Sequence, residues 1–219
     1  MKCHLSRADP KREKMKKDFK ALLLIRHCES SHVQERYIGR TDSPLTQAGI
    51  LQAHKLAKRL KRLRYGYVLS SPSRRALETA RVATQGTGSV IQTVEDLREI
   101  DFGRWEGMTF QEICARDPEL VDQWAQGRMN FRFPNGESLS DFWERVGRME
   151  HRLRRIPEET VIAVSHGGLI RFLLCRFLGL NPQSHLAFEI LPGSVTTIHL
   201  YNGKAVLSGL NDRHHLEEL

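Results

Sequence analysis

The sequence predicts an α/β fold, a three-layer α/β/α sandwich with a mainly parallel central sheet and an inserted cap of helices and loops. Two observations support this prediction. Short apolar runs typical of buried strands alternate with longer segments whose apolar residues recur at helical spacing, and several of the runs end in polar clusters. This alternation indicates βαβ units, which place helices on both faces of a sheet. With 219 residues and 40% hydrophobic content, the chain suits one domain with an insertion.

The expected strands are the apolar runs themselves. Residues 21–26 are nearly all apolar, as in a strand buried on both faces. Asn202 and Gly203 predict the tight turn of a hairpin between the last two strands. The expected strands cover residues 21–26, 67–69, 90–94, 160–164, 195–201 and 205–207.

Amphipathic segments follow most of these runs and are expected to be helices. Thr46 and Ser73 stand where an N-cap side chain would begin two of them. The expected helices cover residues 45–63, 74–84, 139–154 and 169–178. Residues 96–138 lack a clean sheet period, so we expect them to form the cap over one end of the sheet.

Three segments are expected along the chain. Residues 1–20 form a basic N-terminal arm, and residues 21–210 form the α/β domain, with the cap at about residues 96–138. Residues 211–219 are expected to be an exposed C-terminal tail that carries His214 and His215.

Bulk charge and cysteine usage limit the class of protein. The net charge of +8 favours anionic partners such as phosphorylated metabolites, nucleic acid or acidic membrane surfaces. No apolar window reaches the roughly 18 residues of a membrane span, and the first apolar cluster is too short for a signal core. The cysteines lack CxxC spacing, which favours reduced thiols in a cytoplasmic protein; they are Cys3, Cys28, Cys114 and Cys175. Histidine spacing of the HExxH type is missing, so we expect no metal, and the GxGxxG and GxxxxGK(S/T) motifs are missing, so we expect no nucleotide cofactor.

Basic and imidazole side chains follow three of the predicted strands. Arg26 and His27 come after the first strand, Arg75 lies one turn beyond the second, and His166 follows the strand at residues 160–164. Because parallel strands place ligands at their carboxyl ends, these groups should converge. Guanidinium and imidazole groups together suit a dianionic phosphate, so the sequence predicts a phosphate site.

These residues belong to a longer ordered set of motifs. The set opens with Arg26-His27-Cys28-Glu29-Ser30 and closes with Ser165-His166-Gly167-Gly168. Between them, in order, lie Gly39, the tract at residues 41–46, Ser70-Ser71-Pro72, Arg75-Ala76, Thr79-Ala80, the tract at residues 99–103, Trp105-Glu106-Gly107 and the tract at residues 134–138. Over residues 21–180 the chain resembles the histidine phosphatase superfamily, also called the phosphoglycerate mutase-like group.

The resemblance implies a phosphomonoester hydrolase that works through a phosphohistidine intermediate. His27 would be the nucleophile, and Arg26, Arg75 and His166 would hold the phosphate oxygens. Glu99 would protonate the leaving oxygen and later deprotonate the attacking water, without a metal ion.

Further substrate contacts are implied at Gly39, together with the amide of Ile38, and at Gly167 and Ser30. Ser165 is a second candidate for an orienting hydroxyl, and Glu29 is expected to be structural. Residues 134–138 are expected to contribute to the pocket wall. Four aromatic side chains are expected to pack rather than to stack on substrate: Phe102, Trp105, Phe142 and Trp143.

Two positions depart from the family pattern. Cys28 stands where glycine is usual, which would either strain the turn or add a thiol beside the nucleophile. The loop at residues 31–38 lacks the usual phosphate-binding asparagine, with Val33 or Gln34 in its vicinity.

Several alternatives remain open at the level of sequence. A cofactor-dependent phosphoglycerate mutase would need a basic cluster after Glu99, but residues 105–112 are acidic and apolar. A catalytically silent phosphate-binding protein is the second alternative. The expected partner is a small phosphorylated metabolite, such as α-ribazole phosphate or a sugar phosphate. Neither nucleic acid nor a membrane is expected as a partner, and the oligomeric state is open.

Overall fold

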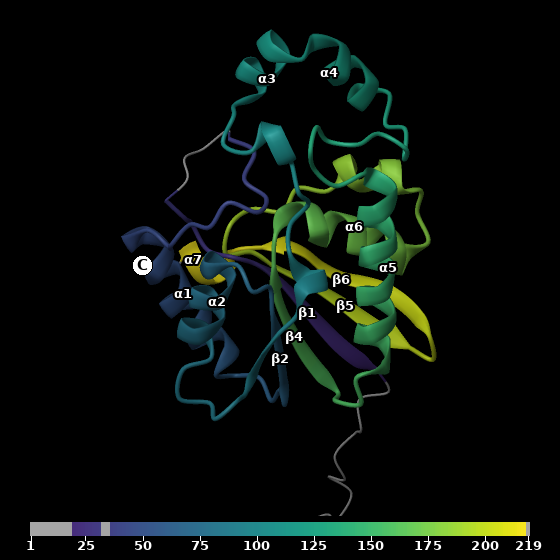
Figure 1. The fold of residues 1–219 in the computed structure, drawn as a ribbon. Helices are drawn as coiled ribbons and strands as arrows, with labels where there is room; N and C mark the ends of the chain where they lie inside the picture. The colour runs from purple at the N-terminus through teal and green to yellow at the C-terminus, as the bar shows by residue number, and fades with distance from the viewer. Residues whose placement is uncertain (1–18, 32–35, 218–219) are drawn as a thin grey trace, which may run out of the picture.

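A six-stranded mixed sheet forms the centre of the molecule. The computed structural model describes residues 19–31 and 36–217, and its strand order is β3-β2-β4-β1-β5-β6 (Figure 1). The strands are β1 (Lys20–Arg26), β2 (Tyr67–Ser70), β3 (Ile91–Thr93), β4 (Thr160–Ser165), β5 (Val195–Tyr201) and β6 (Lys204–Asp212). The β1–β4, β2–β4 and β2–β3 pairs are parallel, whereas β5 runs antiparallel to β1 and to β6.

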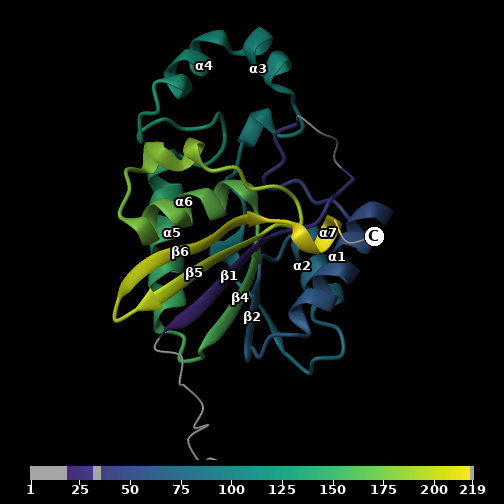
Figure 2. The same cartoon turned by 180° about the vertical axis from the view of Figure 1, so that it is seen from behind.

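Helices cover both faces of this sheet, and the alternation within β1 shows how. Leu22 and Leu24 belong to the core cluster shared with α5 and α6, whereas Leu23 and Ile25 belong to the cluster shared with α1 and α2. The helices are α1 (Gln47–Leu60), α2 (Arg74–Ala83), α5 (Leu139–Arg155) and α6 (Gly167–Leu178). The two pairs lie on opposite sides of the sheet in Figures 1 and 2. The predicted three-layer sandwich with a mainly parallel sheet is therefore confirmed.

Helix starts follow the polar residues that precede them. Thr46 caps α1 as predicted, because its hydroxyl accepts a hydrogen bond from the Gly49 amide at 2.9 Å. Ser73 occupies the N-cap position of α2, but its side chain makes no capping hydrogen bond. Its hydroxyl instead lies 3.2 Å from that of Ser71, which belongs to the site described below.

The segment between β3 and α5 forms a cap beyond the carboxyl ends of the parallel strands, as Figures 1 and 2 show. It contains the 3₁₀ helices η1 (Glu95–Leu97) and η2 (Gly103–Trp105), then α3 (Phe110–Arg116) and α4 (Pro118–Ala125). A capping box between Thr109 and Glu112 begins α3. Trp105, Trp124 and Phe133 pack with ring centroids less than 6 Å apart and form the cap's own apolar centre.

Both expected terminal segments need correction where the structure describes them. Lys20 is not part of an arm, because it is the first residue of β1; residues 1–18 lie outside the described residues. The expected C-terminal tail is also wrong for residues 211–217. There β6 continues to Asp212, α7 (His214–Glu217) packs beside α1, and His215 is only 7% exposed.

The predicted hairpin turn is present between β5 and β6. Asn202 (φ 44°) and Gly203 (φ 85°) both have positive φ, as a tight type I′ turn requires. A last 3₁₀ helix, η3 (Pro182–Ala187), follows α6. Among the described residues, no helix has the length and apolar character needed to cross a bilayer.

Candidate active site

His27 lies directly after β1, at the carboxyl edge of the sheet, and is 7% exposed. Its Nδ1 lies 2.8 Å from the carbonyl oxygen of Cys28, so that this nitrogen carries the proton. The Nε atom of Arg75 donates to His27 Nε2 at 3.2 Å. His27 Nε2 is therefore the unprotonated ring nitrogen, and its electron pair accepts a hydrogen bond from a guanidinium.

Arg75 is 1% exposed and is held by backbone carbonyls of the loop at residues 38–41. Its terminal nitrogens donate to Thr41 and Gly39 at 2.9 Å each. This guanidinium is thus fixed from one side by the loop while its Nε contacts His27.

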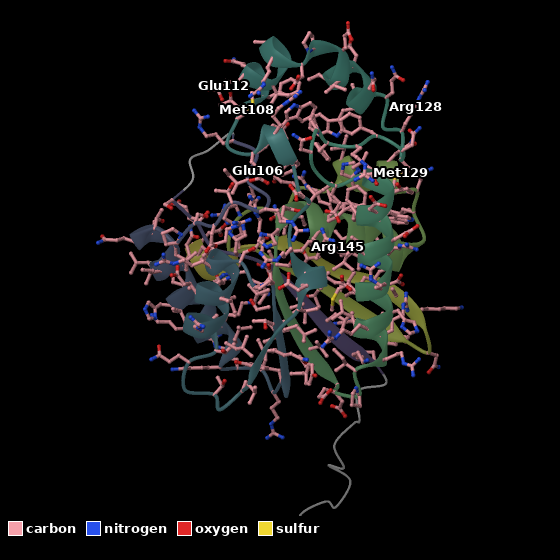
Figure 3. All side chains as sticks on the ribbon, in the orientation of Figure 1. Glu106, Met108, Glu112, Arg128, Met129 and Arg145 are labelled. Atoms are coloured by element: carbon pink, nitrogen blue, oxygen red, sulfur yellow. The ribbon has the colours of Figure 1, made fainter. Side chains whose placement is uncertain are left out.

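Glu106 explains why that loop can present its carbonyls inward. Its carboxylate accepts hydrogen bonds from the amides of Gly39, Arg40 and Thr41 at 2.8 to 3.2 Å and from the Thr41 hydroxyl at 2.7 Å. Figure 3 shows Glu106 on the side of the cap nearest the sheet. The loop amides point to Glu106, so the carbonyls are left for Arg75.

Burial and nearby cations set the charge state of His27. Burial, followed by the charges of Arg26 and Arg75, holds the pKa of His27 well below its ordinary value of 6.5. Burial also lowers the pKa of Arg26 to about 10, against the opposing influence of Glu99, so this guanidinium stays charged near neutral pH. A neutral imidazole therefore lies among permanent cations.

His166 is fully buried and lies edge-on to His27, with 5.2 Å between the ring centroids. Its Nε2 lies 2.8 Å from the hydroxyl of Ser71. His166 Nδ1 and Arg26 Nε are buried and have no hydrogen-bond partner within residues 19–31 and 36–217. Buried polar atoms without partners are costly, and both of these atoms are available to hydrogen-bond a bound anion.

Glu99 comes from the cap side of the site and is 7% exposed. Its carboxylate accepts hydrogen bonds from the amides of Gly168 at 2.9 Å and Leu169 at 3.1 Å, at the amino end of α6. Gly168 makes this approach possible, because a Cβ there would lie 2.5 Å from Glu99 Oε1. The sequence elements after β1, β2, β3 and β4 thus meet in one cluster.

A cavity of about 600 Å³ extends from this cluster under the cap. Arg26, Glu99 and Gly168 line one part of it, with Arg171 beyond them. An apolar cavity of about 580 Å³ adjoins it, and the two share several lining residues. The shared residues are Tyr37, Phe110, Trp124, Leu139, Phe172, His185 and Leu186.

Other predicted site residues have varied surroundings. Gly167 lines the cavity, whereas the Gly39 amide is already bound to Glu106. Ser30 is paired with Leu45 through a backbone bridge, and no side-chain hydrogen bond of Ser30 is found within the described residues. Ser165 donates to the carbonyl of Leu97 at 2.7 Å.

Glu29 accepts a hydrogen bond from the Thr46 hydroxyl at 2.7 Å, so the structure gives this side chain a contact at the start of α1. None of the residues 134–138 lines the cavity under the cap, so their expected contribution to the pocket wall stays a prediction. Within that tract Glu137 instead pairs with Arg145. Phe102 and Phe142 do line the cavity, whereas Trp105 and Trp143 pack elsewhere.

Cys28 causes neither of the two effects considered from the sequence. Its φ is not positive, and its thiol is fully buried against Leu45 and Ala53. Burial raises its pKa to about 12, so the thiol stays protonated and is not a competing nucleophile. Val33 and Gln34, in the vicinity of the missing asparagine, lie outside the described residues.

Sequence reasoning missed three residues that organise the site: Ser71, Glu106 and Arg145. Ser71 and Glu106 lie in the Ser-Ser-Pro and Trp-Glu-Gly motifs. These motifs marked the two positions but did not indicate the contacts that the side chains make. Arg145 stands in an ordinary amphipathic helix, where no local pattern marks it.

The fold and this site define an α/β protein with a cluster of arginine and histidine side chains at the carboxyl edge of its sheet. A family model described as the histidine phosphatase superfamily (branch 1) matches residues 22–213. The chain belongs to this superfamily, and it is a phosphatase.

Relatives and solved structures agree with this placement. Phosphoserine phosphatase 1 of Hydrogenobacter thermophilus is 32% identical over 199 residues, which cover 90% of this chain and 94% of that protein. The adenosylcobalamin/alpha-ribazole phosphatase of Escherichia coli is 30% identical, with coverage of 88% and 96%. The structure of the alpha-ribazole phosphatase from Shigella flexneri matches with a TM-score of 0.82 and 31% identity, and covers 88% of this chain and 96% of that chain.

Proposed function

We propose that the enzyme hydrolyses phosphomonoesters through a phosphohistidine on His27. The observation that carries the proposal is the hydrogen bonding of this ring. Because Nδ1 is bound to the Cys28 carbonyl, Nε2 is left as the nucleophile beside Arg75. The depressed pKa of His27 keeps that nitrogen unprotonated at neutral pH.

In the first step, Nε2 of His27 forms a bond to phosphorus while the bond from phosphorus to the leaving oxygen breaks. Arg26, Arg75 and His166 stabilise the charge on the phosphate oxygens. Protonated Glu99 gives its proton to the leaving oxygen, so that a neutral alcohol departs.

In the second step, water attacks the phosphorus of the phosphohistidine. Glu99, now a carboxylate, accepts a proton from this water while the bond between phosphorus and Nε2 breaks. Inorganic phosphate leaves, and His27 and Glu99 return to their starting protonation states. The guanidinium and imidazole groups supply the positive charge that a metal ion supplies in other phosphoryl transfers, so we propose a metal-independent reaction.

The shape and lining of the cavity support a bulky, largely apolar leaving alcohol. Beyond Glu99 the walls are formed by aromatic and aliphatic side chains, among them Phe110, Trp124 and Phe172. The alcohol of α-ribazole phosphate, a riboside that carries an aromatic base, would bury more apolar surface there than the small alcohol of phosphoserine. Among the substrates of the named relatives, we therefore favour the former.

The test is release of inorganic phosphate, in the presence of a chelator, from α-ribazole phosphate, phosphoserine, sugar phosphates and phosphoglycerates. The expected result is turnover that resists the chelator, is lost in His27→Ala and is highest with α-ribazole phosphate. Conversion of one phosphoglycerate isomer to another without phosphate release would support the mutase alternative. Phosphate binding without any turnover would support the catalytically silent alternative.

A further inference from the structure

The general acid of the proposed reaction lies in a segment with no regular structure of its own. Glu99 follows η1, and the backbone is extended at Arg98 and forms neither helix nor strand over residues 99–102. Within this segment the Ile100 amide donates to Glu99 Oε1 at 3.1 Å, but the segment has no regular backbone structure to hold that side chain in place. Contacts from other elements must do so.

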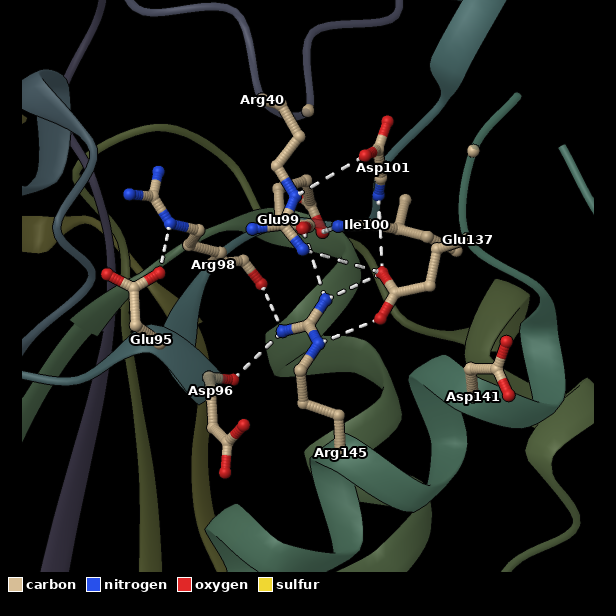
Figure 4. A network of polar contacts seen from close by, with 12 residues as sticks. Arg40, Glu95, Asp96, Arg98, Glu99, Ile100, Asp101, Glu137, Asp141 and Arg145 are labelled. Carbon is tan, nitrogen blue, oxygen red and sulfur yellow. Dashed lines mark hydrogen bonds and ion pairs between the residues drawn. The ribbon is translucent and has the colours of Figure 1, made fainter. Parts of the chain in front are cut away.

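Arg145 of α5 supplies such contacts from beneath the segment. Its Nη1 atom donates to the carbonyls of Asp96 at 3.0 Å and Arg98 at 2.7 Å, and its Nη2 atom donates to the carbonyl of Glu99 at 3.2 Å. Figure 4 shows the guanidinium pointing into the curve of this segment. One side chain thus binds three carbonyls on and just before Glu99.

Glu137 holds Arg145 in that orientation through a bidentate ion pair. Arg145 Nε lies 2.9 Å from one carboxylate oxygen and Arg145 Nη2 lies 2.8 Å from the other. The two side chains are only 8% and 13% exposed. Glu137 also exchanges backbone and side-chain hydrogen bonds with Asp101, at 3.0 and 3.3 Å, on the other side of Glu99.

We infer that the buried Arg145–Glu137 pair positions Glu99 for proton transfer to the leaving oxygen. Neither residue lines the cavity, so both act through Glu99 as positioning residues. The inference rests on the proposed function, in which Glu99 is the acid. If the pair only stabilised the fold, breaking it would lower the activity on all substrates equally. If the pair positions the acid, breaking it lowers the activity most on substrates whose leaving group needs a proton.

The experiment compares three phosphate esters of similar size in the full chain: p-nitrophenyl phosphate, phenyl phosphate and benzyl phosphate. The leaving oxygens become more basic in that order, so dependence on the acid rises. Values of kcat/KM are used because they report only the steps up to formation of the phosphohistidine. In Arg145→Gln we expect kcat/KM to fall about 10- to 100-fold for benzyl phosphate and less than about 3-fold for p-nitrophenyl phosphate.

Two control variants separate the effect from a general loss of structure. Arg148 lies on the same helix and pairs with the Asp96 side chain at 3.1 Å, but it is 60% exposed. Arg148→Gln should leave the three kcat/KM values in their native ratios. Glu106→Gln, which disturbs the loop that holds Arg75, should lower all three values by a similar factor.

Glu137→Gln is the alternative variant if Arg145→Gln does not fold. It keeps the Arg145 guanidinium and replaces only the carboxylate that pairs with it. We expect the same dependence on the leaving group with a smaller amplitude. If Glu99→Gln shows this dependence but folded Arg145→Gln and Glu137→Gln lose activity equally on all three esters, or not at all, the inference is wrong. If Glu99→Gln itself shows no such dependence, the proposed role of Glu99 is wrong instead.

Discussion

At the scale of single residues, the positive charges of Arg26 and Arg75 have two effects, one on His27 and one on the phosphate of the proposed reaction. Burial, then the charges of Arg26 and Arg75, lowers the pKa of the His27 imidazole, and in the proposed reaction the same two charges would attract the dianionic phosphate. The imidazole of His27 is already neutral near neutral pH, so in the proposed reaction no separate base is needed to deprotonate it.

This coupling predicts a shift in the pH profile when one charge is removed. In Arg75→Gln the imidazolium is less disfavoured, so the pKa of His27 should rise toward 6.5. The acidic limb of the plot of kcat/KM against pH should then move to higher pH than in the native enzyme. Arg132→Gln is the charge-matched control, since Arg132 is 57% exposed and pairs with Asp141. An acidic limb that stays in place, or moves to lower pH, in Arg75→Gln would contradict the account.

At the scale of elements, the start of α6 provides a direct comparison between two neighbouring glycines. A Cβ at Gly168 would lie 2.5 Å from Glu99 Oε1, whereas a Cβ at Gly167 would lie 3.4 Å from the Arg26 guanidinium. Gly168→Ala should therefore displace the acid and lower kcat/KM for benzyl phosphate about 10-fold or more. Gly167→Ala should have a much smaller effect.

We expect both variants to keep the native fold, because the atom displaced in Gly168→Ala is the end of a flexible side chain. Thermal unfolding of both variants checks this expectation. Equal activity of the two variants on benzyl phosphate would show that the contact between Gly168 and Glu99 is unimportant.

The order of the elements, and the reactive residues at strand ends, could be predicted because each has a local signal. The apolar run before His27 and the run before His166 mark adjacent parallel strands, and the fold rule brings their ends together. Arg145 could not be predicted, since it acts on carbonyls about 46 to 49 residues away in the chain. The same limit applies to His215, whose burial depends on α1 and not on its own neighbours in sequence.

At the scale of the whole molecule, buried neutral histidines couple stability to pH. The pKa values of His27 and His166 are well below 6.5 in the folded state, and burial lowers that of His215 to about 4. Below about pH 6.5 the unfolded chain binds protons that the folded chain does not, so stability should fall as the pH decreases.

The expected loss is about 1 kcal/mol per histidine between about pH 6.5 and about pH 5.5, measured by urea unfolding. His215→Gln should reduce this dependence with little change in phosphatase activity, because His215 packs beside α1 and reaches the His27 segment through the Gly193 backbone rather than directly. A free energy of unfolding that is constant or higher at the lower pH would be inconsistent with neutral histidines in the core.

Trapping the phosphoryl group on the enzyme would show whether His27 is the nucleophile. Glu99→Gln is mixed with p-nitrophenyl phosphate, which needs little help from the acid in the first step but depends on Glu99 in the second. The sample is then denatured at alkaline pH, and the intact mass and peptide masses are recorded. We expect one added phosphoryl group, on the peptide that contains His27, and none when His27→Ala is combined with this variant. Phosphorylation at another residue, or p-nitrophenol release without any phosphorylated enzyme, would contradict the proposed role of His27.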